Sequence, residues 1–591
     1  MTFSDPHSFA RPSEARMHHA DLELTIDFEQ RVLRGKVMIH FTAAPGIRRL
    51  ILDTRQLHIL RVTLDGSESS APFSMGPPDE ILGQPLEIRI QPHNKIATIW
   101  YETSPDAPAL QWLSPAQTAG GQEPFLYTQS QAILCRSWIP VQDSPSIRFT
   151  YTATVRGKPG HLVLMSARNP QNISPDGTYH FVMPHPIPAY LMALAAGRLA
   201  FSPLDHRTGV YAEPEVLSLA LQDFAETPKM LAVAEALYGP YAWDRYDILV
   251  MPPAFPFGGM ENPCLTFATP TILTGDKSLT SLIAHELAHS WSGNYTTNAT
   301  WCDFWLNEGF TVFLERRIMQ ELYGEPYMHM LEVLGYSDLQ NTINQLMAEG
   351  RAAFTTLHLP LEDHDPDDAV SDIAYEKGYL FLRQLQRMLG VTATDQLLKM
   401  WFERHAFASV TTQDFLNFFK EHLTVDQWQT LMPDSWIFQP GLPGHTAPHS
   451  QIFEEVEKAA QDAMRGRFPS QSQWISWYSQ MRQQFLRTLA HRQPSPEQLA
   501  ALDQHLQITN SRNSEEVFLW LQMALKAGYF DVVPKVEEFL STVGRRKFVL
   551  PLMQTLLSIP ALKEWGKAQF LNIWGPRYHY VTYNSVARLL D

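Results

Sequence analysis

Two histidines with a glutamate between them form the pattern "HELAH" at residues 285–289. On a helix, His285 and His289 lie one turn apart, so both imidazoles leave the same face with Cβ atoms about 6 Å apart and can hold one metal ion. Glu286 lies between them, where its carboxylate can reach a water molecule beside that ion. The spacing therefore predicts a metal centre that carries its own general base.

A catalytic zinc ion needs a third protein ligand and keeps a fourth position open for water. Eighteen residues separate His289 from Glu308, which opens a second apolar-periodic helix in "FWLNEGFTVFLERRI". Glu308 can complete a site of two histidines and one glutamate. Glu315, seven residues further on the same helical face, can bind a ligating histidine. Although HExxH alone also fits a helix with two surface histidines, this combination predicts one Zn²⁺ ion per chain.

Charge and composition exclude several classes of protein. The 591 residues carry a formal net charge of −16, with no run of lysine and arginine that would bind phosphates, so we expect no nucleic-acid partner. No signal peptide and no apolar run of about 18 residues is visible, so no membrane partner is expected. The three cysteines are far apart and form no disulfide framework. We expect a cytoplasmic monomer.

Hydrophobic periodicity divides the chain into three parts. Apolar residues alternate at Leu22, Leu24 and Ile26, and similar runs continue to about residue 200. Helical and strand patterns mix from there to a proline- and glycine-rich stretch, and the remainder has helical spacing. We predict a multidomain α+β protein with an antiparallel β domain, a mixed α/β domain, a linker and an α-helical domain. Their predicted bounds are 1–200, 201–440, 441–451 and 452–591.

Several longer segments resemble the zinc aminopeptidase family M1, the gluzincins that include aminopeptidase N, aminopeptidase B and leukotriene A(4) hydrolase. These segments are "FPFGGMENPCLTF", "HELAHSW", "WLNEGFT" and "YEKGY". The similarity is greatest to the leukotriene A(4) hydrolase and aminopeptidase B branch, through "ALQWLSPAQTAGG", "YTQSQAILCRSWIPVQDSPS" and "GRRKF". The resemblance implies that the α/β domain is thermolysin-like and that the helical domain is of the armadillo or HEAT type.

The same resemblance implies roles for residues outside the metal centre. Glu261 would bind the free α-amino group of a peptide, and Tyr375 would donate a hydrogen bond to the oxyanion. Arg545 and Lys547 would bind the substrate carboxylate. The remaining positions implied to bind substrate are Gly258, Gly259, Met260 and Asn262 beside Glu261, Asp367, and Gln129 and Gln131, with Gln131 at the position where many relatives have a second glutamate.

Together these residues predict a zinc aminopeptidase that removes the first residue of short peptides with a free N-terminus. A bifunctional enzyme that also opens a fatty-acid epoxide is an alternative because Asp367 is present, although Val370 stands where the vertebrate enzyme has tyrosine. For peptides, Asp367 could instead attract a basic first side chain. An inactive peptide-binding scaffold is disfavoured because the ligands and the base are all in place. A thermolysin-type endopeptidase is disfavoured, because it would not need the amine-binding segment "GGMEN".

Overall fold

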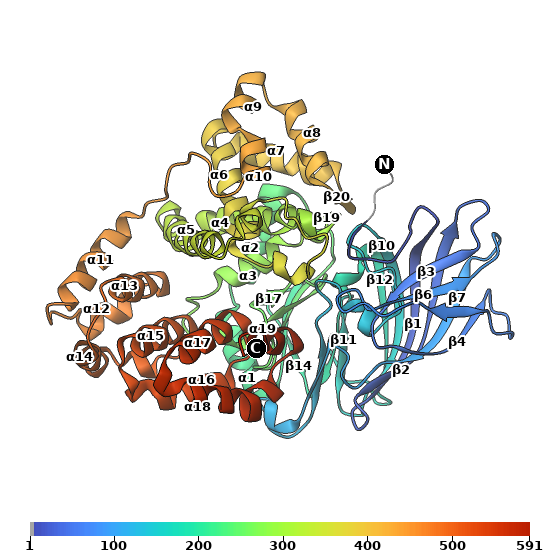
Figure 1. The fold of residues 1–591 in the computed structure, drawn as a ribbon, viewed down its shortest axis with the longest axis horizontal. Helices are drawn as coiled ribbons and strands as arrows, with labels where there is room; N and C mark the ends of the chain where they lie inside the picture. The colour runs from blue at the N-terminus through green and yellow to red at the C-terminus, as the bar shows by residue number, and fades with distance from the viewer. Residues whose placement is uncertain (1–4, 591) are drawn as a thin grey trace.

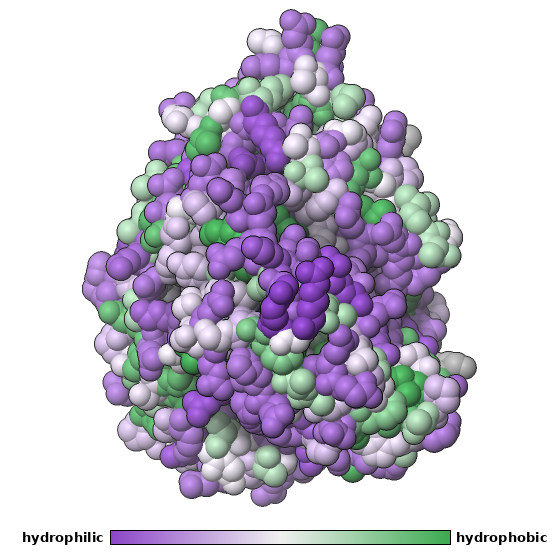
Figure 2. Space-filling view, turned by 90° about the vertical axis from the view of Figure 1, so that its left-hand side faces the viewer, coloured by the Kyte–Doolittle hydropathy of each residue, from purple (hydrophilic) through white to green (hydrophobic). Residues whose placement is uncertain are grey.

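The computed structural model describes residues 5–590, and its three domains confirm the predicted architecture. In Figure 1 the N-terminal β domain lies on the right, the C-terminal helices on the lower left, and the second domain at the top and centre. Among the residues described, no helix is both long and apolar enough to cross a membrane. The face in Figure 2 is largely hydrophilic, with apolar residues scattered in small groups.

The alternating residues of the first part form the predicted β domain. Leu22, Leu24 and Ile26 are buried on one face of β1. Its main sheet has the order β12-β10-β1-β2-β7-β4. The strands are β1 (Ala15–Asp27), β2 (Val32–Ala43), β4 (His58–Leu64), β7 (Ile96–Glu102), β10 (Arg148–Arg156) and β12 (Thr178–Pro188).

The sheet is not antiparallel throughout, which corrects the sequence-based expectation. β1 and β10 pair in parallel, with His19 opposite Thr150. Parallel neighbours need a long connection between them, and here the strands from β2 to β9 supply it. Alternation within one strand cannot reveal which distant strand will lie beside it, or in which direction.

Two smaller sheets complete the β domain. The sheet β11-β13-β9-β8 carries the chain towards the second domain, and β3-β6-β5 lies beside the main sheet. The strands of the first are β8 (Leu110–Leu113), β9 (Phe125–Thr128), β11 (Leu162–Met165) and β13 (Leu194–Gly197). The strands of the second are β3 (Arg49–Thr54), β5 (Phe73–Met75) and β6 (Gln84–Arg89).

The second domain has a mixed sheet with the order β14-β15-β16-β18-β17. The short strand β17 is at its edge and pairs antiparallel with β18, with Gly259 opposite Ala268. The strands are β14 (Ala200–Pro203), β15 (Thr208–Ala212), β16 (Tyr246–Val250), β17 (Gly259–Met260) and β18 (Leu265–Ala268), while β19 (Thr296–Asn298) pairs with β20 (Ala408–Val410). The edge position leaves one side of β17 free.

Two helices of the second domain, α1 (Pro214–Asp223) and α3 (Ser281–Ala288), pack against this sheet, and the others form a largely helical region. The others are α2 (Thr227–Tyr238), α4 (Trp305–Tyr323), α5 (Glu325–Ala348), α6 (Gly378–Leu389), α7 (Val391–Arg404), α8 (Thr412–His422), α9 (Val425–Leu431) and α10 (Pro433–Phe438). The helix that carries "HELAH" is short: α3 ends at Ala288, yet the His289 N–H still donates to the His285 carbonyl at 3.2 Å. A π-helical turn, Ile373–Lys377, precedes α6.

The third domain is helical, and a segment without helix or strand between α10 and α11 occupies the region of the expected linker. Its helices are α11 (Gln451–Ala463), α12 (Gln471–Ser476), α13 (Ser479–His491), α14 (Pro496–Leu506), α15 (Ser514–Ala527), α16 (Val533–Thr542), α17 (Arg546–Ser558), α18 (Pro560–Gln569) and α19 (Tyr580–Ala587). Ser495 caps α14, and Gln498 completes a capping box.

Two glycines let α4 approach the π-helical turn closely. A Cβ atom on Gly309 would lie 2.7 Å from the Gly378 Cα and 3.0 Å from the Ala374 carbonyl oxygen. The obstacles are backbone atoms, which cannot rotate away as a side chain can. The glycines of "NEGF" and "EKGY" therefore set the distance between two helical segments.

We expect Gly309→Ala to lower the free energy of unfolding by about 1–3 kcal/mol because the added methyl group must separate two backbones. The measurement is the midpoint of thermal unfolding. Gly566→Ala in α18 is the control, since its Cβ would meet only side-chain atoms of Leu556, the nearest at 3.4 Å. That change should be neutral or stabilise by up to about 1 kcal/mol. Equal effects of the two substitutions would contradict the close-approach argument.

Candidate metal centre and active site

Three ligand atoms from α3 and α4 converge on one point. The two Nε2 atoms of His285 and His289 lie 3.2 Å apart. Glu308 Oε2 lies 3.4 Å from the first and 3.5 Å from the second. A point equidistant from three atoms at these separations lies roughly 2 Å from each, which is the bond length that zinc requires. The predicted ligands therefore match a zinc ion in kind, number and spacing.

Hydrogen bonds behind the ligands orient the two imidazoles. His289 Nδ1 donates to the Ser292 carbonyl at 2.9 Å, and His285 Nδ1 lies 3.1 Å from Glu315 Oε2. Since both Nδ1 atoms are used as donors, both Nε2 lone pairs face inward. Glu308 Oε2 is buried there without a hydrogen-bond partner. Three acceptors that face one another in a largely shielded place favour a cation between them, so the residues fit the metal.

Glu286 lies against the edge strand β17. Its side chain is buried, and a Cβ atom on Gly259 would lie 2.1 Å from its Oε1. Only glycine leaves room for this carboxylate. Burial raises the pKa of Glu286 to about 8, and the nearby His285 opposes the rise. A divalent cation at the ligand triangle would also favour the carboxylate form.

Glu261 is a second buried carboxyl group without a partner. The residue is 4% exposed, and its Oε1 has no hydrogen bond. Burial raises its pKa well above the usual range, and Glu308 and Glu286 add to the rise because they carry the same charge. Asn294 holds the backbone by donating to the Glu261 carbonyl at 2.7 Å. A cationic group that enters here would pair with the buried carboxylate and offset its repulsion from Glu308 and Glu286.

Tyr375 stands on the π-helical turn beside the metal ligands. Its ring is nearly parallel to that of His285, with centroids 6.1 Å apart. Burial raises its pKa well above the usual range, and the charge of Glu308 contributes, so the hydroxyl keeps its hydrogen. On the same turn, Glu376 accepts from Arg316 Nη2 at 2.7 Å, and Lys377 Nζ donates to the Thr355 carbonyl at 2.7 Å.

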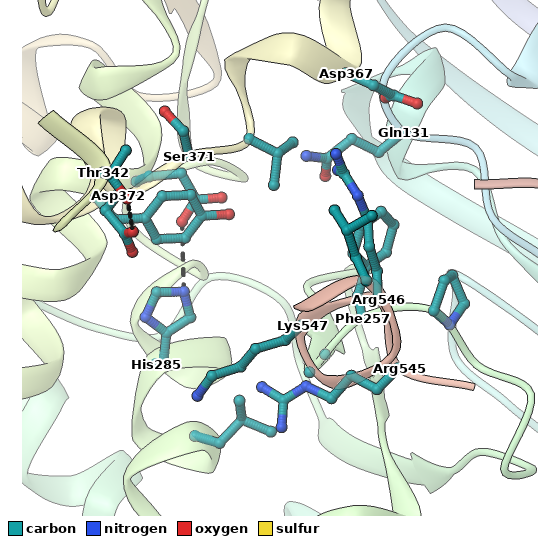
Figure 3. A pocket seen from close by; sticks show the side chains of 18 of the residues that line it. Gln131, Phe257, His285, Thr342, Asp367, Ser371, Asp372, Arg545, Arg546 and Lys547 are labelled. Carbon is teal, nitrogen blue, oxygen red and sulfur yellow. Dashed lines mark hydrogen bonds and ion pairs between the residues drawn. The ribbon is translucent and has the colours of Figure 1, made fainter. Parts of the chain in front are cut away.

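The metal centre opens into a cleft of about 770 Å³. Figure 3 shows His285 on one side, Gln131 and Asp367 on another, and Arg545 with Lys547 near the start of α17. The predicted substrate-binding residues among its lining are Gln131, Gly258, Gly259, Met260, Glu261, Asp367, Arg545 and Lys547. Gln129 and Asn262 are buried and are not among the residues lining it; Gln129 instead contacts the Met260 sulfur at 3.1 Å.

Asp367 has few partners for a shielded carboxyl group. The Ala132 N–H donates to its Oδ1 at 3.3 Å. Shielding from water raises the pKa of Asp367 to about 7, with a further contribution from the charge of Asp365. The charge of Arg546, which also lines the cleft, opposes this rise, and the carboxyl group keeps capacity for another hydrogen bond or a cation.

Sequence reasoning missed Glu515, at the start of α15. Lys547 Nζ lies 2.8 Å from both of its carboxylate oxygens, and Arg545 Nη1 lies 3.5 Å from Oε1. Because Arg546 also lines the cleft, Glu515 faces three bases, and this end of the cleft keeps a positive charge. No periodicity links Glu515 to residues about 30 positions later, so only the way the helices pack could show this contact.

We expect Glu315→Ala to weaken zinc binding about 10- to 100-fold because His285 Nδ1 loses its acceptor. Competition with a chelator measures this affinity. Glu321→Ala is the control on the same helix, since its half-exposed carboxylate pairs with Arg317 away from the ligands. Unchanged zinc affinity in Glu315→Ala would show that the contact does not support the site.

Models of three domains match consecutive parts of the chain. The Peptidase M1 N-terminal domain matches residues 16–191, the Peptidase family M1 domain residues 223–436, and the C-terminal domain of leukotriene A4 hydrolase residues 477–590. The order is that of the three domains described above.

Whole-length relatives agree with the domain matches. The chain is 37% identical to leukotriene A-4 hydrolase of Xenopus laevis, covering 96% of each protein. It is 35% identical to leucine aminopeptidase 2 of Yarrowia lipolytica, covering 94% of this chain and 89% of that protein. The structure of yeast LTA4 hydrolase with bestatin superimposes with a TM-score of 0.91 at 32% identity, covering 100% of this chain and 98% of the other. The chain therefore belongs to peptidase family M1, among homologues of leukotriene A4 hydrolase and leucine aminopeptidase.

Proposed function

We propose that this protein is a zinc aminopeptidase that releases the first residue of short peptides. The observation that carries the proposal is Glu261, a buried carboxyl group without a partner. One of its oxygens lies within 4.8 Å of a carboxylate oxygen of Glu286 and of a ring nitrogen of His289. An ammonium group is the natural partner of such a carboxylate. A peptide bound by its amino end at Glu261 presents its first peptide bond to the metal centre.

His285, His289 and Glu308 would hold the zinc ion. When bound, the ion acidifies a water molecule and polarises the scissile carbonyl. Glu286 accepts the proton of the attacking water and later passes it to the leaving amine nitrogen. Tyr375 donates a hydrogen bond to the carbonyl oxygen as negative charge develops there, and its raised pKa keeps the hydrogen available.

Contacts at both ends of the cleft support a preference for short substrates. Arg545 and Lys547 suit a terminal carboxylate, because together with Arg546 they stay positively charged after pairing with Glu515. A Cβ atom on Gly258 would lie 2.6 Å from Arg545 Nη2, so the guanidinium lies beside the strand that leads to Glu261. A basic cluster in the same cleft as Glu261 favours short peptides, whose terminal carboxylate can reach it.

Asp367 supports a preference for a basic first side chain. Its carboxyl group has spare hydrogen-bonding capacity and lies in the cleft wall next to Gln131.

We also propose that the protein acts as a monomer in the cytoplasm. The wide spacing of its three cysteines, all unpaired and buried, agrees with a reducing compartment.

Acetylation of the amino terminus should lower kcat/KM by on the order of 100-fold, because it removes the charge that pairs with buried Glu261. The measurement compares a tripeptide with its N-acetylated copy. Glu261→Gln should reduce the ratio between the two substrates. Equal cleavage of both peptides by the wild-type protein would refute the aminopeptidase proposal in favour of an endopeptidase.

Glu286→Gln should reduce turnover by about 10²- to 10⁴-fold, because the amide cannot accept the proton of water. Elemental analysis should still find about one zinc ion per chain, since the three ligands are unchanged. Turnover assays should therefore be normalised to bound zinc. Substantial activity in the zinc-loaded variant would exclude Glu286 as the base.

A further inference from the structure

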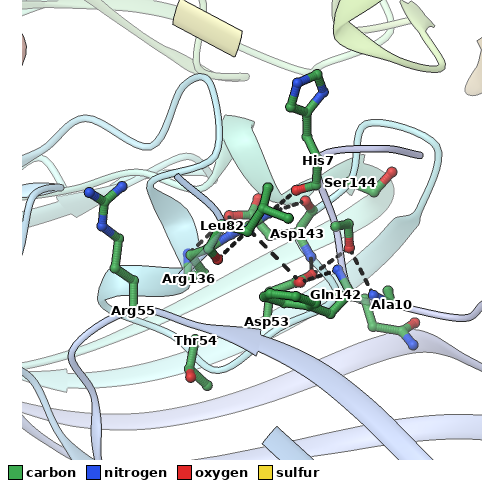
Figure 4. Close-up of polar contacts among 12 residues, drawn as sticks. His7, Ala10, Asp53, Thr54, Arg55, Leu82, Arg136, Gln142, Asp143 and Ser144 are labelled. Atoms are coloured by element: carbon green, nitrogen blue, oxygen red, sulfur yellow. Dashed lines mark hydrogen bonds and ion pairs between the residues drawn. The ribbon is translucent and has the colours of Figure 1, made fainter. Parts of the chain in front are cut away.

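The segment of residues 5–10, here called the N-terminal strap, is bound to the β domain by buried polar contacts (Figure 4). Asp53 is fully buried and accepts from Ser8 Oγ at 2.6 Å and from the Phe9 N–H at 2.7 Å. The same carboxylate accepts from the Asp143 N–H at 2.8 Å. Buried, charge-assisted contacts of this kind hold a segment firmly because each broken bond leaves a charge without a partner.

Arg136 connects the strap to the segment that contains Gln131 and Ala132 and forms part of the cleft wall. Its guanidinium is fully buried, with Nε 3.0 Å from Asp143 Oδ2 and Nη1 2.8 Å from the Leu82 carbonyl. Its Nη2 donates to the His7 carbonyl at 2.7 Å. Arg136 follows Gln131 by five residues, so the strap is attached close to the point where that segment enters the cleft.

The His7 side chain reaches across to the second domain. Its ring is buried, and Nε2 lies 2.9 Å from the Leu361 carbonyl oxygen and 3.1 Å from that of His364. Because carbonyl oxygens can only accept, Nε2 must carry the hydrogen and share it between them. One residue therefore bonds the β domain through its carbonyl group and the second domain through its ring.

The loop that contains Leu361 and His364, whose carbonyl groups bind the His7 ring, leads directly to Asp367. The side chain of Asp365 accepts from the Asp367 N–H at 3.0 Å, and Arg588 Nη2 lies 3.4 Å from the same carboxylate group. In the cleft, the loop meets the other segment where the Ala132 N–H donates to Asp367. The two segments thus touch at the cleft wall and are joined behind it by His7.

We propose that His7 is a positioning residue: it sets the separation of the Gln131–Ala132 segment from Asp367 and thereby the preference for a basic first residue. The proposal deepens the proposed function and rests on the role of Asp367 in it. His7 lines no part of the cleft, so it acts through the loop and does not touch the substrate. Without its N–H, two carbonyl groups lose their donor and the loop can shift.

The test compares His7→Leu, which has no donor, with His7→Gln, which retains an N–H group. The measured quantity is the ratio of kcat/KM for an arginine arylamide to that for a leucine arylamide. His7→Leu should lower this ratio by about fivefold, through a higher KM for the arginine substrate, as expected for a weakened ion pair. His7→Gln should keep the ratio within about twofold of the wild-type value. Zinc content and kcat for the leucine substrate should stay unchanged.

Ser8→Ala is the matched control, because it removes a buried strap contact with Asp53 but leaves the bridge of His7 intact. We expect a lower midpoint of thermal unfolding and an unchanged substrate ratio. Equal loss of kcat/KM for both arylamides in His7→Leu, or an unchanged ratio, would overturn the proposal.

Hydrogen–deuterium exchange of residues 361–370 gives a readout that needs no activity. Exchange should be faster in His7→Leu than in the wild-type protein and should return towards wild type in His7→Gln. Unchanged exchange overturns the positioning role even if neither arylamide is cleaved. A wild-type protein that binds zinc but cleaves neither substrate would instead refute the proposed function.

Discussion

Mutual repulsion among buried acidic groups is the constraint on which the active site depends. Glu261, Glu286 and Glu308 lie within one shielded region: burial raises the pKa of Glu261 and of Glu286, and the charge of Glu308 adds to both rises. A divalent ion at the ligand triangle and a substrate ammonium group at Glu261 supply the missing positive charge. The cleft is therefore complementary to a metal together with a peptide amino end, and the two binding events support each other electrostatically.

Rigid backbone contacts place these charges. The Glu308 ligand and the Tyr375 hydroxyl come from α4 and the π-helical turn, which touch through Gly309 and Gly378. Gly259 leaves room for the Glu286 side chain beside β17; the atoms that an added methyl group would meet there belong to that side chain. At each place an added methyl group would meet atoms that the chemistry needs to keep where they are. The absence of side chains is thus what allows the reacting groups to approach one another.

The sequence predicted the parts of the site that local spacing determines. His285, Glu286 and His289 follow from one helical turn, and the three-domain division follows from the change in hydrophobic period. Glu308 could be predicted as the third ligand because it begins a second helical pattern at a suitable distance from the histidines. The parallel pairing of β1 with β10 and the contact of Glu515 with Lys547 could not be predicted, because each joins residues far apart in the chain. Roles such as that of Tyr375 came from family resemblance, since nothing in its local pattern distinguishes it from other tyrosines.

The strap shows why long-range contacts of this kind cannot be predicted from sequence patterns. Residues 5–10 have neither strand alternation nor helical spacing, and the structure fixes them through single hydrogen bonds to partners as distant as Leu361. Their order comes from buried charges on Arg136 and Asp53, whose partners are largely backbone groups of any residue type. Because a backbone carbonyl leaves no signature in the sequence, such a bridge can be recognised only in three dimensions. A cleft assembled from several domains depends on such bridges, since no single domain contains both of its walls.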